Sequence, residues 1–246
     1  MSNICTICRR ELAACYLSPV AYVTTAIFLL VANATFVVGV LRNLGGDEPL
    51  PTLLFNAIAL SLPILVTVIT MRLFAEEKRS GTIEILLTAP VRDVEVVLGK
   101  YAAALIFAAL ALAPAVAAIF ALDWLCPGVT LADVDPGAVL AGSLLLAAQC
   151  AMFTALGTLI SLTSPNQIVS GIACFLAIWL ALMLGWLLSL APGVPPRLAE
   201  AVAATTHLED FARGVIDARP LLLYASGTAL LLFVAVRLLE TRRWAG

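Results

Sequence analysis

Few residues in this chain have the type and spacing that catalysis or metal binding requires. Cys5 and Cys8 form a CxxC pair, but no second pair or neighbouring histidine completes a zinc site, which disfavours a metal or redox role. His207 is the single histidine, so HExxH zinc sites are excluded, and no GxSxG motif occurs. Gly99 and Lys100 lack the glycine five positions earlier that a phosphate-binding loop requires. We therefore predict no catalytic, cofactor-binding or metal-binding residues here, and any ATP hydrolysis must occur on another polypeptide.

The composition indicates that membrane helices must position whatever site the chain has. Of the 246 residues 62% are hydrophobic and 12% are charged, and the mean hydropathy is +1.06. The net charge of −2 offers no basic surface for nucleic acid. We predict an all-α, polytopic membrane protein with a single domain over residues 1–246. Its six expected spans are Val20–Leu41, Thr52–Leu73, Val97–Leu122, Gly137–Leu162, Gln167–Leu190 and Leu221–Leu239.

The distribution of basic residues predicts the orientation of these spans. With the N-terminus in the cytoplasm, ten of the 14 lysines and arginines lie inside. The four that lie outside are Arg42, Arg197, Arg213 and Arg219. Because short cytoplasmic loops are enriched in Lys and Arg, both termini are expected in the cytoplasm.

The first 19 residues predict a short amphipathic helix that lies in the membrane interface. Apolar residues recur there at helical spacing, with charged residues between them. A frayed tail is the alternative, since the apolar stripe is only moderately hydrophobic. The residues of this stripe are Ile4, Ile7, Cys8, Leu12 and Cys15.

The longest stretch that is not apolar, Met71–Tyr101, carries a third of all charged residues and lies between two predicted spans. Residues Arg72–Arg79 are expected to continue the second span as a helix into solvent. Gly81 permits a sharp change of direction, and residues 83–87 place an apolar stripe on one helical turn. Pro90 is then expected to end this helical turn and to open the next helix.

This pattern predicts a docking surface for a soluble partner over residues 72–96. A spacer loop has no need of an apolar stripe between two charged helices. The residues expected to make the contact are Glu76, Glu77, Arg79, Gly81, Thr82, Glu84 and Leu87.

A second amphipathic segment lies within residues 191–220, just before the last span. Thr206 and Glu209 have the spacing of a capping box, and apolar residues follow at helical period over His207–Asp217. We expect an extracytoplasmic helix that rests on or dips into the membrane; a plain surface helix is the alternative. Its predicted apolar face carries Leu208, Phe211 and Val215.

Several motifs resemble those of one family, the ABC-2 type transporter permeases, and in particular its gliding-motility and copper-enzyme-maturation branch. The run FAEEKRSGTIEILLTAPVRDVEVVLGK is similar to the cytoplasmic segment of these permeases. The other matching pieces, in chain order, are YLSPVAYVTTAIFLL, SPNQIV, HLEDFARGVID and RLLETRRW. The resemblance covers nearly the whole chain.

This resemblance implies a permease subunit of an ATP-driven exporter in a bacterial cytoplasmic (inner) membrane. A separate ABC ATPase subunit would bind ATP and Mg²⁺ and would contact the segment over residues 72–96. The helices before the last span would close the outer end of the pathway. Since six spans are half of the usual twelve, a second copy or a similar permease is expected, with membrane lipids as the remaining partners.

Other functions remain alternatives on the residues alone. The chain could be a non-transporting membrane anchor or assembly factor for a soluble partner. An intramembrane enzyme is disfavoured because nucleophile–base pairs are missing, and an ion-coupled transporter because the spans lack carboxylates. Polar residues within the spans could line a path, but we expect most to hydrogen-bond between helices. They are Asn33, Thr35, Asn56, Ser61, Thr67, Gln149 and Thr154.

Overall fold

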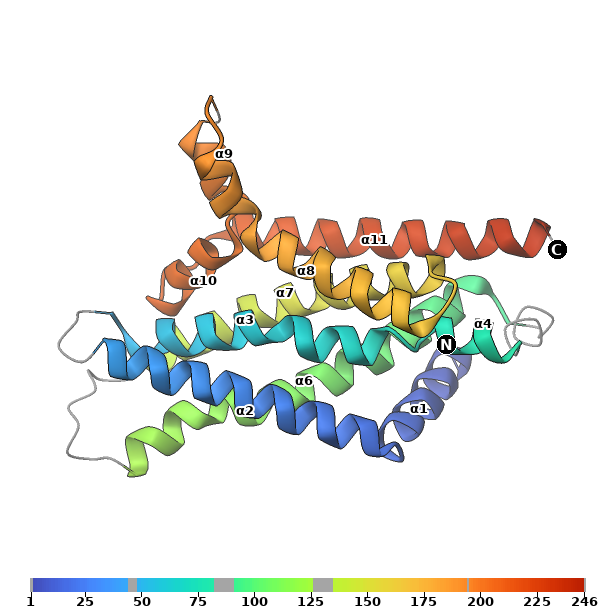
Figure 1. Ribbon diagram of the computed structural model, residues 1–246, viewed down its shortest axis with the longest axis horizontal. Coiled ribbons are helices and arrows are strands. Elements are labelled where there is room, and N and C mark those ends of the chain that lie inside the picture. Colours follow the sequence, from blue (N-terminus) through green and yellow to red (C-terminus); the bar gives the residue numbers. More distant parts are fainter. Residues whose placement is uncertain (1, 44–47, 82–90, 126–134, 194, 246) are drawn as a thin grey trace.

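The computed structural model describes residues 2–43, 48–81, 91–125, 135–193 and 195–245, and the regular structure in these ranges is α-helical. Six of the helices are long and apolar enough to cross a membrane, and they run alongside one another (Figure 1). The prediction of an all-α protein with six potential spans is therefore confirmed. These helices are α2 (Pro19–Arg42), α3 (Leu50–Thr70), α6 (Asp93–Leu125), α7 (Pro136–Thr163), α8 (Gln167–Leu190) and α11 (Ala218–Ala245).

Shorter helices distinguish the two ends of this bundle. Helices α1 (Ser2–Tyr16) and α4 (Ala75–Ser80) lie at the end where the chain starts and finishes, on the right of Figure 1. We call this the α4 end. Helices α9 (Pro196–Glu200) and α10 (Ala204–Ala212) lie at the opposite α10 end, where α9 points away from the bundle. The helix predicted near the N-terminus is thus present as α1.

Helix α3 forms the centre of the bundle because its sequence is apolar on all sides. It contacts α2, α6, α7, α8 and α10. Two glycines of α7 allow the closest approach: a Cβ on Gly142 would overlap the ring of Phe55, and one on Gly157 would overlap the side chain of Thr70. Small residues at such crossings let helix backbones pack tightly inside a membrane. Helices α3 and α7 therefore form a closely packed pair with the same direction.

The predicted continuous helix from the second span through Arg79 is wrong. Helix α3 ends at Thr70, a turn follows, and α4 begins at Ala75. The hydroxyl of Ser161 on α7 accepts hydrogen bonds from the backbone N–H groups of Phe74 (3.1 Å) and Ala75 (3.3 Å). The Ser161 hydroxyl, on another helix, therefore takes the place of the backbone carbonyls that would accept these hydrogen bonds in a continuous helix.

Most other boundaries follow the predicted signals. Helix α6 starts at Asp93, with acidic residues in its first turn as expected near a helix N-terminus. Helix α8 starts at the predicted Gln167. Asn166 caps it, and its side-chain oxygen accepts a hydrogen bond from the backbone N–H of Val169 (2.9 Å).

Candidate functional site

The α4 end holds a charged cluster that joins three helices. Lys100 of α6 is only 1% exposed, and its Nζ lies 2.8 Å from Oε1 of Glu77 on α4 and 3.1 Å from Oε1 of Glu11 on α1. The same ammonium donates a hydrogen bond to the carbonyl of Leu73 (2.8 Å) and lies 5.3 Å from the ring centre of Phe74. A buried ammonium is tolerated only with such partners.

The charge on Glu11 follows from its place in this cluster. Burial alone would raise the pKa of this carboxyl, but attraction to Lys100 and the hydrogen bond from Arg10 outweigh it, so the pKa is lowered. Arg10 is mostly exposed and covers the cluster from outside, with its guanidinium 2.9 Å from Glu11 and 3.6 Å from Glu77. Glu11 therefore stays ionised and keeps α1 attached to α6.

Helix α4 is also attached to the end of α7. The ammonium of Lys78 donates to the backbone carbonyls of Leu162 and Ser164, which lie at the C-terminus of α7. A cation there complements the partial negative charge of a helix end and satisfies carbonyls that lack partners within the helix. Together with Ser161, this contact fixes α4 to α7 as firmly as Lys100 fixes it to α6.

The opposite face of α4 carries the exposed part of the predicted docking set. Glu76 and Arg79 point to solvent, whereas Glu77 is directed inward to Lys100. Gly81 ends α4 in the left-handed conformation, with φ of 72°, which is the conformation that a glycine permits. The predicted change of direction after it falls on residues outside the described ranges. Three further members of the predicted set, Thr82, Glu84 and Leu87, lie outside the described residues.

At the α10 end, the amphipathic helix is shorter and more deeply placed than predicted. Helix α10 starts two residues before Thr206, so the predicted capping box is wrong, and it contacts α3, α7 and α8. Leu208 and Phe211 are buried in these contacts. Val215 is 59% exposed and lies beyond the helix, because the chain turns at Gly214 with φ of 82°. Val215 is therefore not on the apolar face where we predicted it.

His207 lies on the buried side of α10. Burial lowers its pKa, although the nearby Asp210 carboxylate opposes that effect. Its Nδ1 lies 3.5 Å from the hydroxyl of Tyr224 on α11, and the two rings meet edge to face. This contact joins α10 to the last membrane-crossing helix.

Three of the polar residues that we predicted to bond between helices do not do so. Asn33, Thr35 and Ser61 bond to backbone carbonyls of their own helices instead. Gln149 is fully buried on α7, and neither of its amide atoms has a hydrogen-bond partner among the described residues. In the same described part of the chain, Asn56 and Thr67 on α3 likewise have buried oxygens without partners. Such groups are costly in a membrane interior and are common at functional positions.

The residues that could do metal or thiol chemistry stay apart. Cys5 and Cys8 are free thiols on α1, and burial raises the pKa of Cys8. Among the described residues, no three His, Cys, Asp or Glu side chains converge as a metal site would require.

Sequence reasoning missed Glu11 and Ser161, and it placed Lys100 at the membrane edge rather than in a buried cluster. The signal available for Lys100 was its place beside a long apolar run, where an ion needs a partner. No local pattern identified Glu11 as a partner of Lys100, or Ser161 as the acceptor for the backbone N–H groups of Phe74 and Ala75, since both are distant in sequence.

Six membrane-crossing helices with charged contacts gathered at one end define a polytopic α-helical membrane protein. The family model described as ABC-2 family transporter protein matches residues 7–233, so the chain belongs to that family. Members of this family are membrane-spanning permease subunits of ABC transporters, which normally work with an ABC ATPase and are generally not catalytic themselves. No curated protein matches the chain.

Proposed function

We propose that this permease subunit belongs to an exporter of the gliding-motility and copper-enzyme-maturation branch, in a bacterial inner membrane with both termini in the cytoplasm. The α4 end then faces the cytoplasm, in agreement with the excess of basic residues on that side. The ATPase docks on the exposed face of α4, through Glu76, Arg79 and Gly81, and on the segment that follows.

The attachment of α4 to three other helices carries this proposal. Lys100, Lys78 and Ser161 hold the inward face of α4 to α6 and α7, and Glu77 connects it to α1 through the charged cluster. A docking helix held in this way moves together with the helices it contacts. Closure of the ATPase would therefore displace α6 and α7 as rigid bodies, which is the motion that alternating access requires.

The second permease subunit is expected against the outer surface of α6. Ala109, Ala113 and Ala117 line a groove of about 610 Å³ between α6 and α7, and small residues at this spacing let a neighbouring helix approach closely. Pairing of two such subunits would complete the usual twelve spans.

Co-purification and ATPase assays test the proposal. In mild detergent, the wild-type chain should retain an ATPase that carries a phosphate-binding loop, and Arg79→Glu should reduce its recovery. Arg197→Glu at the α10 end is the matched control and should leave recovery unchanged. Equal loss for both variants, or none for either, would contradict docking on α4. A retained ATPase whose turnover never responds to transported substrate would indicate the anchor function instead.

Cysteine labelling tests the orientation separately. In a background with Cys5→Ser, Cys8→Ser and Cys126→Ser, an impermeant reagent added to intact cells should label Arg197→Cys and not Ser80→Cys. The reverse pattern would overturn the assignment of the α4 end to the cytoplasm.

A further inference from the structure

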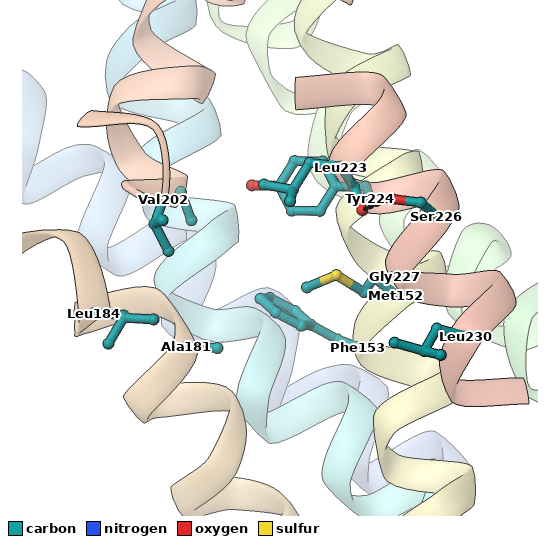
Figure 2. A pocket seen from close by; sticks show the side chains of 11 residues that line it. Met152, Phe153, Ala181, Leu184, Val202, Leu223, Tyr224, Ser226, Gly227 and Leu230 are labelled. Atoms are coloured by element: carbon teal, nitrogen blue, oxygen red, sulfur yellow. Dashed lines mark hydrogen bonds between the residues drawn. The ribbon is translucent and has the colours of Figure 1, made fainter. Parts of the chain in front are cut away.

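A cavity of about 540 Å³ lies between α7, α8, α10 and α11, close to the α10 end. Figure 2 shows side chains from these helices converging on it, with Phe153 and Met152 from α7 and Leu184 from α8. Its size is in the range of small-molecule sites, which are mostly apolar with a few polar groups. The remaining lining residues are Ala181, Val202, Ala204, Leu223, Tyr224, Ser226, Gly227 and Leu230.

The cavity lies at the depth of one leaflet. Tyr224 and Leu230 follow Leu221, where the last predicted span starts, by three and nine residues. At a rise of about 1.5 Å per residue, they lie roughly 5 Å and 14 Å below that end of the span. The hydrocarbon core of a bilayer is about 30 Å thick, so this interval falls in the half nearest to α10.

One polar group points into this apolar space. Tyr224 is only 3% exposed, and its hydroxyl is directed away from α11 toward Val202 (Figure 2). The hydrogen-bond partner of that hydroxyl, Nδ1 of His207, lies 3.5 Å away, at the limit of a hydrogen bond. A buried hydroxyl is usually satisfied fully, so Tyr224 can donate a stronger bond to an occupant of the cavity.

The cavity is also accessible from the side where lipid would lie. Leu223 and Leu230 on α11 are 43% and 63% exposed, and little of α11 is buried within the bundle. A water molecule in the cavity would have hardly any hydrogen-bonding partners among these residues, whereas a hydrocarbon chain gives up no hydrogen bonds when it enters. Lipid acyl chains are the hydrocarbon present at this depth.

We propose that this cavity binds an acyl chain of a phospholipid from the leaflet on the α10 side. The chain inserts between α8 and α11, and the Tyr224 hydroxyl donates a hydrogen bond to an ester carbonyl of the lipid. His207 contacts the same hydroxyl and meets the Tyr224 ring edge to face. Because α10 forms part of the wall, a bound lipid also contributes to the position of that helix.

Photolabelling in lipid nanodiscs tests this site without ATP or transport substrate, so it is independent of the proposed function. The full chain is placed in phosphatidylcholine nanodiscs that contain a phospholipid with a diazirine in the middle of one acyl chain. After irradiation, labelled peptides are quantified by mass spectrometry. The wild-type protein should carry more label at Met152 and Leu184 than at Leu30, a lipid-facing residue of α2 that is 69% exposed.

Two variants and one control make the result specific. Ala181→Phe places a ring in the cavity and should remove the excess label, whereas Leu180→Phe, at the neighbouring 58% exposed position, should keep it. Tyr224→Phe should raise the probe concentration needed for half-maximal labelling about two- to tenfold, as expected for loss of one hydrogen bond. Folding of each variant is checked by gel filtration.

Three outcomes would overturn the proposal. Labelling that simply follows surface exposure would indicate annular lipid without a site. Equal labelling of Ala181→Phe and wild type would place the bound chain elsewhere. Cross-links from these residues to a second copy of the protein, in place of lipid, would identify the cavity as part of a subunit contact.

Discussion

The ammonium of Lys100 lies 2.8 Å from the carboxylate of Glu77, and this contact joins the third membrane-crossing helix to α4 across 23 residues of sequence. Glu11 adds α1 to the same ammonium. Because a buried charge that loses its partner is far more costly than a surface charge, the three helices are expected to move together. A docking surface on α4 would therefore be mechanically connected to both α1 and α6.

Removal of the buried cation should destabilise the protein strongly. Lys100→Met leaves Glu11 and Glu77 close together with only the exposed Arg10 as counter-charge, and breaking a buried pair in this way costs about 3–5 kcal/mol. We expect a lower melting temperature in detergent and a smaller amount of folded protein. Static light scattering during heating would measure the first, and fluorescence gel filtration the second.

A double-mutant cycle provides the control for this cluster. Glu77→Gln combined with Lys100→Met should be less destabilising than the sum of the two single changes, because the double variant has fewer unpaired charges. Arg237→Met is a matched control, since its ion pair with Glu240 is on the surface and such pairs contribute about 0–1 kcal/mol. Additive effects at Lys100 and Glu77 would show that the two side chains do not interact.

The conformation of Gly81 provides a second prediction, which concerns coupling rather than stability. No atom of the described residues lies within 4 Å of where a Cβ would be, so the cost that we expect for a side chain comes from φ of 72°. Gly81→Val should strain the backbone by at least about 1 kcal/mol, and Gly81→Asn by less, because Asn tolerates this conformation. We expect normal membrane insertion for both, and loss of substrate-stimulated ATPase activity for Gly81→Val only.

If Gly81→Val and Gly81→Asn both retained full stimulation, the redirection at this residue would not matter for coupling. Equal loss for both would indicate that the side chain itself, and not the backbone, disturbs the contact. The amount of each variant in the membrane fraction must be measured in parallel.

The spans could be predicted from sequence because membrane crossing depends on the length and apolarity of a local segment. The break between Thr70 and Ala75 could not, since it depends on Ser161, which lies more than eighty residues away in sequence. For the same reason, the basic residues predicted which positions share one end of the bundle, but not that Lys100 is buried there. Local sequence patterns also predicted the wrong bounds for α10. Contacts with α3, α7 and α8 set the start of this helix, and the turn at Gly214 follows its end.

Gln149 should tolerate an apolar replacement as far as stability is concerned. Neither of its amide atoms has a partner although the side chain is fully buried. Replacing an unsatisfied polar group by an apolar one of similar size removes a desolvation penalty of about 1–3 kcal/mol. We expect Gln149→Met to melt at the same temperature as the wild type or higher. A lower melting temperature would mean that this amide is satisfied in the membrane, for instance by water.

Transport by the Gln149→Met variant tests whether the amide has a role in function. If Gln149 contacts substrate or a water path during the cycle, Gln149→Met should lose transport while its stability is kept. Ser61→Ala is a useful comparison, because the Ser61 hydroxyl bonds to its own helix and its removal should affect neither property strongly.

Substitutions of Phe211 on α10 and of Val215 in the turn after it should differ strongly in their effect on stability. Phe211 is fully buried, so Phe211→Ala should cost about 3–5 kcal/mol through the cavity it leaves. Val215 is mostly exposed, and Val215→Asp should change the free energy of unfolding by no more than about 0.5 kcal/mol. Melting curves of the two variants decide this. A large effect of Val215→Asp would indicate that a partner covers the turn.

The pH dependence of stability should contain a contribution from His207. Burial lowers its folded-state pKa below the ordinary value of about 6.5, so the folded protein favours the neutral ring. Its contribution is fully present above pH 6.5 and is lost as the pH falls through the lowered value, because protonation then favours unfolding.

Melting temperatures measured between about pH 7.5 and pH 5.5 bracket the ordinary histidine pKa. Wild type should lose stability over this interval more than His207→Gln, which has no titrating ring. The comparison uses the difference between the two curves, since Asp210 and Asp217 also influence the ring and remain in both proteins. Parallel curves would show that His207 is protonated as easily in the folded chain as in the unfolded one.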